Sequence, residues 1–211
     1  MKKLIDQLKF YAVTDSRWLG EQTLYQQVQA ALEGGVTCVQ LREKHMDKMK
    51  LLQIAQEIHQ LCQSYQVPFI MNDYVDLAIA CKAEGIHVGQ KDMQAMQVRA
   101  QIPKDCLLGV SVQTVEQAKL AQAQGADYLG VGTIFPTTTK TDAVTVSKQT
   151  LTAICQAVQI PVVAIGGIEQ NNIQQLAGTG IVGVALVSSI FAQEDITQSC
   201  IQLKKEIWRH L

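Results

Sequence analysis

Short and almost uninterrupted hydrophobic runs recur along the chain, separated by longer amphipathic stretches. Runs of this length that are apolar at nearly every position are typical of strands buried on both faces of a parallel sheet. The runs lie at residues 10–14, 38–41, 68–71, 86–88, 107–110, 128–131, 162–165 and 184–187. The pattern therefore predicts eight parallel strands.

The stretches between these runs have helical periodicity. Residues 23–33 place Leu24, Val28 and Leu32 on one face, and residues 51–61 repeat the pattern. Polar residues of the kind that begin helices precede three of the stretches, and glycines of the kind that end helices follow others. The predicted N-caps are Asp47, Thr114 and Ser147. We expect helices to connect successive strands, the shortest of them near residues 95–101.

Eight strands alternating with helices in 211 residues fit two α/β architectures. One is a closed (β/α)8 TIM barrel near the lower end of its size range, and the other is an open doubly wound sheet, which requires no fixed strand number. The count of eight favours the barrel. No Pro-rich or Ser-rich linker divides the chain, so we expect residues 1–211 to form a single barrel domain.

Chemically reactive side chains follow the predicted strands, whereas the turns that precede them are plain. These segments are residues 42–44, 72–73, 90–92, 111, 136–140, 166–168 and 188–189. In a barrel, the carboxyl ends of all strands open onto one mouth, where barrel enzymes build their active sites. The sequence therefore predicts an active site at the C-terminal ends of the strands.

Composition and charge exclude several classes of partner. A formal net charge of −1 and an aromatic content of 5% provide neither a basic face nor stacking platforms for nucleic acid. Gly183 interrupts the longest apolar stretch, residues 181–192, which is shorter than a membrane span. The six cysteines lie far apart in the sequence and form no Cys-x-x-Cys motif. This spacing is typical of free thiols in a reducing compartment. We expect a cytoplasmic protein that binds neither nucleic acid nor membranes.

Asp73 and Asp92 follow the third and fourth predicted strands. Neighbouring strands lie about 5 Å apart, and two carboxylates that close repel each other unless they share a proton or a cation. Either aspartate alone is equally suited to cap the helix that follows it. Together, and with cations nearby, they favour Mg²⁺, which commonly takes one or two carboxylates and completes its shell with water and substrate phosphates.

Two groups of residues at the predicted mouth suit anions. Arg42, Lys44 and Lys140 are cations at strand ends, and beside two acids they indicate a substrate with more negative charge than one phosphate, such as a diphosphate. Gly167 and Ser188 lie in the loops after the seventh and eighth strands, which often bind a phosphate in barrels.

Several familiar signatures are absent from the sequence. It contains no Gly-x-x-x-x-Gly-Lys loop, no Gly-x-Gly-x-x-Gly and no Gly-x-Ser-x-Gly. His59 and His210 fall on helical patterns and are predicted to be surface residues, whereas His45 and His87 lie nearer the mouth without an evident nucleophile beside them. The long segment 133–146 suits a lid or a solvated loop. This inventory favours a chemistry that needs no strong base.

Seven motifs in this order resemble the thiamine-phosphate synthase family over nearly the whole chain. They lie at residues 11–15 (YAVTD), 40–44 (QLREK), 72–73 (ND), 89–93 (GQKDM), 109–111 (GVS), 136–140 (PTTTK) and 165–168 (IGGI). The resemblance implies a β/α barrel that joins a hydroxymethylpyrimidine diphosphate to a thiazole phosphate and releases pyrophosphate. It also implies small-molecule substrates and Mg²⁺ as cofactor.

The resemblance further assigns roles to residues of this chain. Lys44, Ser111 and Lys140 would be catalytic, and Asp73 and Asp92 would bind Mg²⁺ on the diphosphate. The residues implied to hold the pyrimidine diphosphate are Gln40, Leu41, Arg42, Glu43, Lys44, Asn72, Ser111 and Lys140. Those implied to hold the thiazole phosphate are Thr137, Thr138, Thr139, Gly167, Val187 and Ser188.

Two other functions remain open at this point. An isomerase resembling the thiazole tautomerases would need the phosphate site but not the metal pair, so Asp73, Asp92, Lys44 and Lys140 count against it. A non-catalytic thiamine-phosphate binder would explain the pockets, although the sequence shows no signalling or DNA-binding segment. Apolar residues on the outer helices fit either the core or an interface between copies, which leaves a homo-oligomer open.

Overall fold

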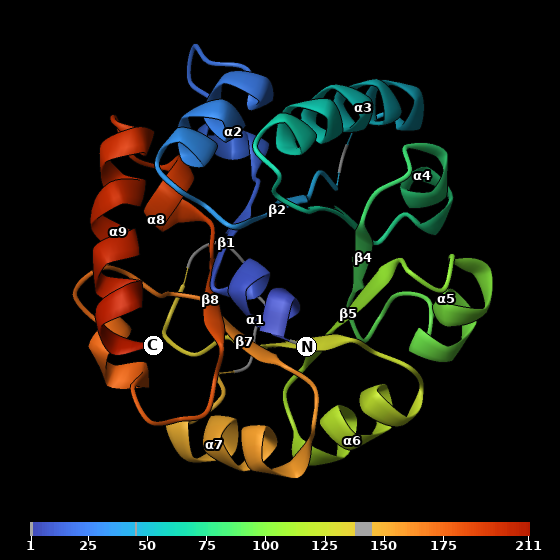
Figure 1. The fold of residues 1–211 in the computed structure, drawn as a ribbon, viewed down its shortest axis with the longest axis vertical. Helices are drawn as coiled ribbons and strands as arrows, with labels where there is room; N and C mark the ends of the chain where they lie inside the picture. The colour runs from blue at the N-terminus through green and yellow to red at the C-terminus, as the bar shows by residue number, and fades with distance from the viewer. Residues whose placement is uncertain (1, 45, 138–144) are drawn as a thin grey trace.

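Eight parallel strands close into a barrel in chain order, with β8 pairing back onto β1 (Figure 1). This computed structural model describes residues 2–44, 46–137 and 145–211. The strands are β1 (Phe10–Val13), β2 (Cys38–Leu41), β3 (Phe69–Asn72), β4 (Gly85–Val88), β5 (Leu107–Val112), β6 (Tyr128–Val131), β7 (Val162–Ile165) and β8 (Gly183–Leu186). The predicted (β/α)8 barrel is confirmed, and the open sheet is excluded.

Helices lie between most successive strands, as the amphipathic stretches predict, but the helix before β1 was not predicted, and a 3₁₀ helix takes the place of the expected α-helix between β7 and β8 (Figure 1). They are α1 (Lys2–Leu8), α2 (Leu24–Glu33), α3 (Lys48–Ser64), α4 (Val75–Ala80), α5 (Ala95–Gln101), α6 (Val115–Ala123), α7 (Lys148–Ala157), α8 (Ser188–Phe191) and α9 (Ile196–His210). The 3₁₀ helices η1 (Ser16–Trp18) and η2 (Ile173–Leu176) follow β1 and β7. Asp47, Thr114 and Ser147 accept backbone hydrogen bonds as N-caps of α3, α6 and α7, as predicted.

Alternate residues along each strand face opposite sides of the barrel wall. On β2, Val39 and Leu41 pack in the large apolar layer under the helices, whereas Cys38 belongs to a smaller cluster inside the barrel. That inner cluster consists of Leu8, Tyr11, Val13, Cys38, Ile70, Tyr128, Val163 and Ala185. Because both faces of every strand are covered, the strand runs are apolar at nearly every position.

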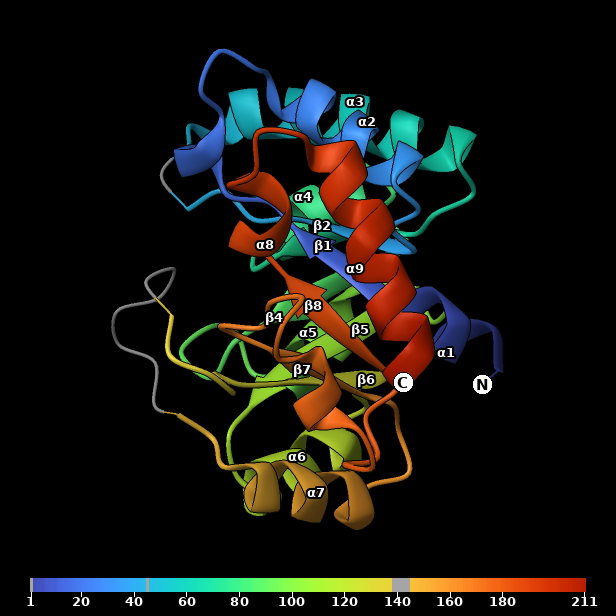
Figure 2. The ribbon, with the colours of Figure 1, turned by 90° about the vertical axis from the view of Figure 1, so that its left-hand side faces the viewer.

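Helix α1 closes the N-terminal end of the barrel. It lies over the centre of the strand ring in Figure 1 and at the opposite end from α8 in Figure 2. Leu8 is 1% exposed inside the barrel, and a Cβ on Gly183 would lie 2.2 Å from its carbonyl oxygen, so only glycine permits this contact. Thr37 Oγ1 also donates to the Gln7 carbonyl over 2.9 Å. The carboxyl ends of the strands are therefore the open end.

His59 was expected at the surface and is instead buried. It lies on the barrel-facing side of α3, with its Nε2 3.0 Å from Glu84 Oε1 and its ring against Phe69. The face of the helix, rather than the polarity of the residue, decides this position. All six cysteines are free thiols, and within the described ranges no helix is both long and apolar enough to cross a membrane.

Candidate active site

A cavity of about 540 Å³ opens at the C-terminal ends of the strands. Barrel geometry brings together side chains that lie far apart in the sequence, because every strand contributes its carboxyl end to the same mouth. The predicted site residues that line the cavity are Gln40, Arg42, Lys44, Asn72, Asp73, Asp92, Ser111, Thr137, Gly167, Val187 and Ser188. Thr138, Thr139 and Lys140 lie outside the described residues.

The motif at residues 40–44 divides between cavity and core. Gln40, Arg42 and Lys44 line the cavity, whereas Leu41 and Glu43 do not. Leu41 is 1% exposed under the helices, and Glu43 Oε1 accepts a hydrogen bond of 3.1 Å from the Thr14 hydroxyl. Burial raises the pKa of Glu43. Side chains alternate between the two faces along β2 and along the residues that extend it, so neighbours in this motif face different sides of the barrel wall.

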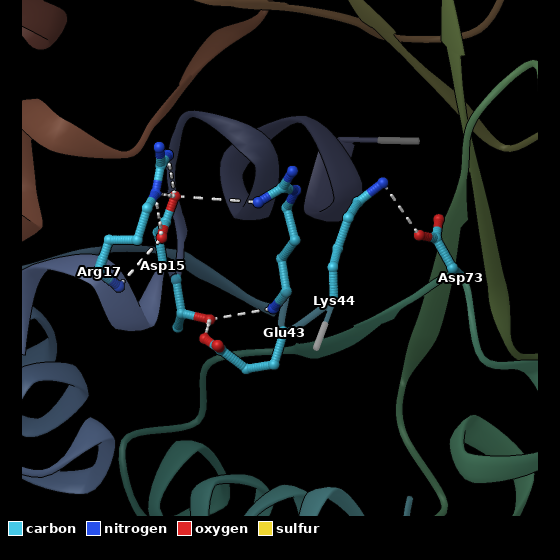
Figure 3. A network of polar contacts seen from close by, with 7 residues as sticks. Asp15, Arg17, Glu43, Lys44 and Asp73 are labelled. Carbon is cyan, nitrogen blue, oxygen red and sulfur yellow. Dashed lines mark hydrogen bonds and ion pairs between the residues drawn. The ribbon is translucent and has the colours of Figure 1, made fainter. Parts of the chain in front are cut away.

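Asp73 and Asp92 face the cavity from the ends of β3 and β4. The Asp73 N–H donates to the His87 carbonyl over 2.9 Å, which holds the residue in a left-handed conformation with φ +62°. Asp92 Oδ2 accepts from the Gly89 N–H over 2.8 Å. Burial and the neighbouring Asp92 charge raise the pKa of Asp73 to about 6, although Lys44, with its Nζ 3.7 Å from Asp73 Oδ2, acts in the opposite direction (Figure 3).

This carboxylate pair fits a divalent cation. Asp73 is partly buried and its proton affinity is raised by the neighbouring Asp92, so a cation held between the two carboxylates would stabilise the ionised form of Asp73. Within residues 2–44, 46–137 and 145–211, no group of three or more His, Cys, Asp or Glu side chains is arranged to hold a metal. An ion bound here would therefore complete its shell with water and substrate oxygens, which is how Mg²⁺ commonly binds.

Asp15 connects two arginines at the rim of the cavity. It accepts a 2.9 Å hydrogen bond from Arg17 Nε, and Arg42 Nη1 lies 3.9 Å from its Oδ2 (Figure 3). Burial acts to raise the pKa of Asp15, but Arg17 holds it below its usual value. Arg17 was not predicted as a residue of the site. The sequence did offer an indication, because Arg17 belongs to a charged segment directly after the first strand, and the reactive residues of the other strands occupy the same position.

The loops after β7 and β8 form the other side of the mouth. Gly166 and Gly167 have φ values of +98° and +64°, and a Cβ on Gly167 would lie 2.4 Å from the Pro136 carbonyl oxygen. Glycine is therefore required where this loop meets the segment that leads to Thr137. Val187 and Ser188 stand at the start of α8, directly beside that loop in the cavity lining.

Two further residues at the floor of the cavity, Tyr11 and Tyr128, were also missed, and His87, predicted to lie near the mouth, joins them there. Tyr11, His87 and Tyr128 point into the barrel from β1, β4 and β6 and are linked by hydrogen bonds. Burial lowers the pKa of His87 to about 4, so its ring is neutral. The signal available in the sequence was their position on the inward-facing register of each strand, which looks like ordinary core until the barrel closes.

The fold and the open end define an enzyme of the β/α-barrel class, with charged groups at the mouth suited to small phosphorylated molecules. The family model described as thiamine monophosphate synthase matches residues 10–190. The chain belongs to this family.

Similar proteins with known names support membership in this family. The chain is 49% identical to the thiamine-phosphate synthase of Clostridium tetani, with 92% of each chain covered. It is 48% identical to that of Ruminiclostridium cellulolyticum, with 96% of each covered. The solved thiamine phosphate pyrophosphorylase of Pyrococcus furiosus superposes with a TM-score of 0.91 and 36% identity over 99% of both chains.

Proposed function

We propose that the chain is a transferase of thiamine biosynthesis that joins 4-amino-2-methyl-5-hydroxymethylpyrimidine diphosphate to thiazole phosphate, giving thiamine phosphate and pyrophosphate. The observation that carries this proposal is that one cavity combines three features. They are a pair of carboxylates, positively charged side chains at the strand ends, and a glycine loop of the kind that binds phosphate. The names of the most similar relatives support the same reaction.

The diphosphate would lie on the side of the mouth formed by β2, β3 and β4. Arg42 and Lys44 line the cavity there, and Asp73 and Asp92 would hold Mg²⁺. The sequence motif adds Lys140 to these cations. Bound Mg²⁺ supplies charge stabilisation for the departing pyrophosphate. Arg42 and Lys44 would stabilise the same negative charge and keep the diphosphate oriented for departure.

The thiazole phosphate would lie on the opposite side, against the loops after β7 and β8. Gly167 allows the phosphate to approach backbone N–H groups, and the Ser188 hydroxyl adds a donor. From the resemblance, Thr137, Thr138 and Thr139 would bind the same phosphate. With one anion held on each side, the reacting carbon and nitrogen would meet over the centre of the barrel.

The reaction needs no general base. The C–O bond to the diphosphate breaks and its electron pair leaves with pyrophosphate, while the electron-rich aminopyrimidine stabilises the methylene cation. The neutral thiazole nitrogen then forms the C–N bond with its own lone pair, and no proton has to leave. Gln40, Asn72 and Ser111 line the cavity where they would hold the pyrimidine ring. Burial lowers the pKa of His87 to about 4, which makes its ring a weak base, consistent with a site that does not abstract a proton.

We also propose that residues 1–211 form one domain in the cytoplasm. All eight strands belong to one closed barrel, which supports a single domain. Six free cysteines support a reducing compartment.

The test combines both substrates with Mg²⁺ and follows thiamine phosphate and pyrophosphate together. We expect the two products in equal amounts and no product after chelation of the metal. Omitting thiazole phosphate is the control for simple hydrolysis of the diphosphate. Folded protein that binds thiazole phosphate but forms no thiamine phosphate would contradict the proposal and favour an isomerase or a binding protein.

A further inference from the structure

Five polar side chains from five different strands form one continuous hydrogen-bonded chain across the floor of the cavity. Gln40 Nε2 donates to Tyr11 Oη over 2.7 Å, and Tyr11 Oη lies 2.9 Å from Tyr128 Oη. His87 Nδ1 lies 3.1 Å from Tyr128 Oη, and His87 Nε2 lies 2.8 Å from Ser111 Oγ. Four of the five are at most 8% exposed, and both ends, Gln40 and Ser111, line the cavity.

Two glycines make room for this chain. A Cβ on Gly109 would lie 2.2 Å from Tyr128 Cζ and 2.4 Å from His87 Nδ1. A Cβ on Gly130 would lie 3.1 Å from His87 Cε1. Both glycines occupy inward-facing positions of β5 and β6, where a larger residue would fill the barrel with apolar atoms. The barrel interior therefore accommodates a tyrosine–histidine contact in place of ordinary apolar packing.

The protons in this chain have a preferred direction. The Gln40 amide nitrogen can only donate, so Tyr11 Oη accepts at one side. His87 is buried, and its two ring nitrogens bond two hydroxyls rather than a carboxylate, so its ring is neutral and only one of its nitrogens donates. Burial raises the pKa of both tyrosines well above the usual value, so both hydroxyls keep their protons.

Only one direction gives a strong acceptor to each of the buried protons on Tyr11, Tyr128 and His87. Tyr11 donates to Tyr128, Tyr128 donates to His87 Nδ1, and His87 Nε2–H donates to Ser111 Oγ. In the opposite direction, Tyr11 Oη would accept two hydrogen bonds and its own proton would be left with the Cys38 thiol, a weak acceptor. The preferred direction leaves the Ser111 O–H free to donate into the cavity.

The two ends of the chain then present opposite groups. Within the described part of the chain, Gln40 Oε1 makes no hydrogen bond, and Gln40 lines the cavity, so this oxygen is an acceptor available to a ligand. Ser111 is a donor. A pyrimidine that presents an amino group to Gln40 and an unprotonated ring nitrogen to Ser111 matches this pair, whereas one that presents an oxo group and a ring N–H reverses both groups.

We propose that Tyr11, Tyr128 and His87 are positioning residues whose hydrogen-bonded chain fixes Ser111 as a donor and Gln40 as an acceptor, and thereby selects an amino-pyrimidine over an oxo-pyrimidine. This inference rests on the proposed function, because it assumes that the pyrimidine lies on the cavity floor. It adds to that function a physical basis for selecting the pyrimidine, which involves three residues that the substrate itself would not touch.

The direction can be measured without any substrate. In protein labelled with ¹⁵N-histidine, the ring nitrogen shifts distinguish the two neutral tautomers, and the His87→Gln variant assigns the signal. We expect the proton on Nε2 and none on Nδ1. A proton on Nδ1 would overturn the inference even in a protein that forms thiamine phosphate, so its failure is distinguishable from failure of the proposed function.

Specificity is measured with ligands that do not react. The probes are 4-amino-2-methyl-5-hydroxymethylpyrimidine monophosphate and its 4-oxo analogue, with dissociation constants from calorimetry. Tyr128→Phe removes the hydroxyl that donates to His87. We expect the ratio of the dissociation constants of the oxo and amino compounds to fall about tenfold, as the loss of one fixed hydrogen bond implies.

Two matched variants control for loss of a buried polar group. His59→Gln removes a similarly buried histidine outside the barrel, and Tyr25→Phe removes an exposed hydroxyl on α2. Both are expected to keep the wild-type preference. An unchanged preference in folded Tyr128→Phe, or an equal narrowing in His59→Gln, would contradict the role of the chain.

Discussion

The two ends of the barrel are built from the same strands but have opposite character. Figure 2 shows α1 at the N-terminal end. There Leu8 packs in an apolar layer that includes Cys38 and Ile70. At the C-terminal end, the cavity is lined by cations, carboxylates and amides. On β2 the change occurs between Cys38 and Gln40, two residues or about 7 Å along one strand.

This contrast separates stability from chemistry. Apolar packing at the closed end does not require like charges or unsatisfied groups, whereas the open end places Asp73 beside Asp92 at a cost to the folded state. The N-terminal layer and the outer helices offset that cost. Substitutions at the two ends should therefore have opposite effects on activity and on stability.

The largest effect is expected from Asp73→Asn at the open end. The neutral side chain tolerates the left-handed backbone at φ +62° but loses the charge that would hold Mg²⁺, so we expect kcat/KM to fall about 1,000-fold. Steady-state kinetics over a range of Mg²⁺ concentrations measure this loss. Asp76→Asn, an exposed carboxylate paired with Lys48, is the matched control and should keep full activity. Comparable losses in the two variants would argue against a metal role for Asp73.

The next effect is expected at the closed end. Leu8→Ala leaves a cavity in the inner apolar layer and should lower the free energy of unfolding by about 3 kcal/mol. Because the mouth is unaffected, kcat/KM at a temperature where the variant is folded should stay near the wild-type value. Denaturant unfolding measures the first quantity, and Leu120→Ala on the exposed face of α6 provides the control. A large loss of activity in folded Leu8→Ala would show that the two ends are coupled.

A smaller effect concerns pH in the absence of metal. Burial and Asp92 raise the pKa of Asp73 from 3.8 to about 6, so the folded state binds this proton more tightly than the unfolded chain. Its contribution to stability is therefore present below the lower value and is lost as the pH rises through about 6. Allowing for partial solvent screening, the loss is about 1–2 kcal/mol.

The measurement for this prediction is the difference in unfolding free energy between wild type and Asp73→Asn from pH 4 to pH 7 without Mg²⁺. Burial lowers the pKa of His87 to about 4, which gives an opposing slope over the same range, and the difference cancels it. Lys48 lowers the pKa of Asp76 from 3.8, so the stability linked to its proton changes mainly below about pH 5, and Asp76→Asn should leave the slope between pH 5 and pH 7 unchanged. A pH-independent difference for Asp73→Asn would contradict the raised pKa.

The smallest effect is expected within the 40–44 motif. Glu43 lies outside the cavity lining and accepts a hydrogen bond from Thr14, which glutamine can also accept. We therefore expect Glu43→Gln to change kcat/KM by less than about threefold, as for a substitution that touches no substrate. Lys44→Gln, one residue further along the chain and inside the cavity, is the comparison and should lose much more. A loss in Glu43→Gln equal to that in Lys44→Gln would place Glu43 on the substrate.

Most of the fold was predictable because its signals are local. All eight strands were expected within one or two residues of their ends, and the helix N-caps at Asp47, Thr114 and Ser147 follow from side chains that satisfy the nearest backbone donors. The placement of the site at the carboxyl ends was predictable for a related reason. Polar residues after a buried strand have few roles in packing, so they indicate chemistry.

The site was predictable only in part. The motif at 40–44 indicated a binding segment but not that Leu41 and Glu43 turn away, because that depends on which side of the wall each residue faces. His59 looked like a surface residue because its helix pattern does not show that Glu84 meets it from another element. Arg17 became part of the mouth through Asp15, a contact within one loop that depends on the loop's conformation.

By itself, the sequence determined the strands, the helices that join them and the end at which chemistry collects, because periodicity and strand-end polarity are properties of neighbouring residues. Only the tertiary structure decided how the interior is divided. Closure of β8 onto β1 brings Gln40, Tyr11, Tyr128, His87 and Ser111 into one hydrogen-bonded chain. The same closure leaves an opening that α1 fills at the other end. The bonds of this hydrogen-bonded chain join residues up to 117 positions apart, and no local pattern encodes which residues will meet.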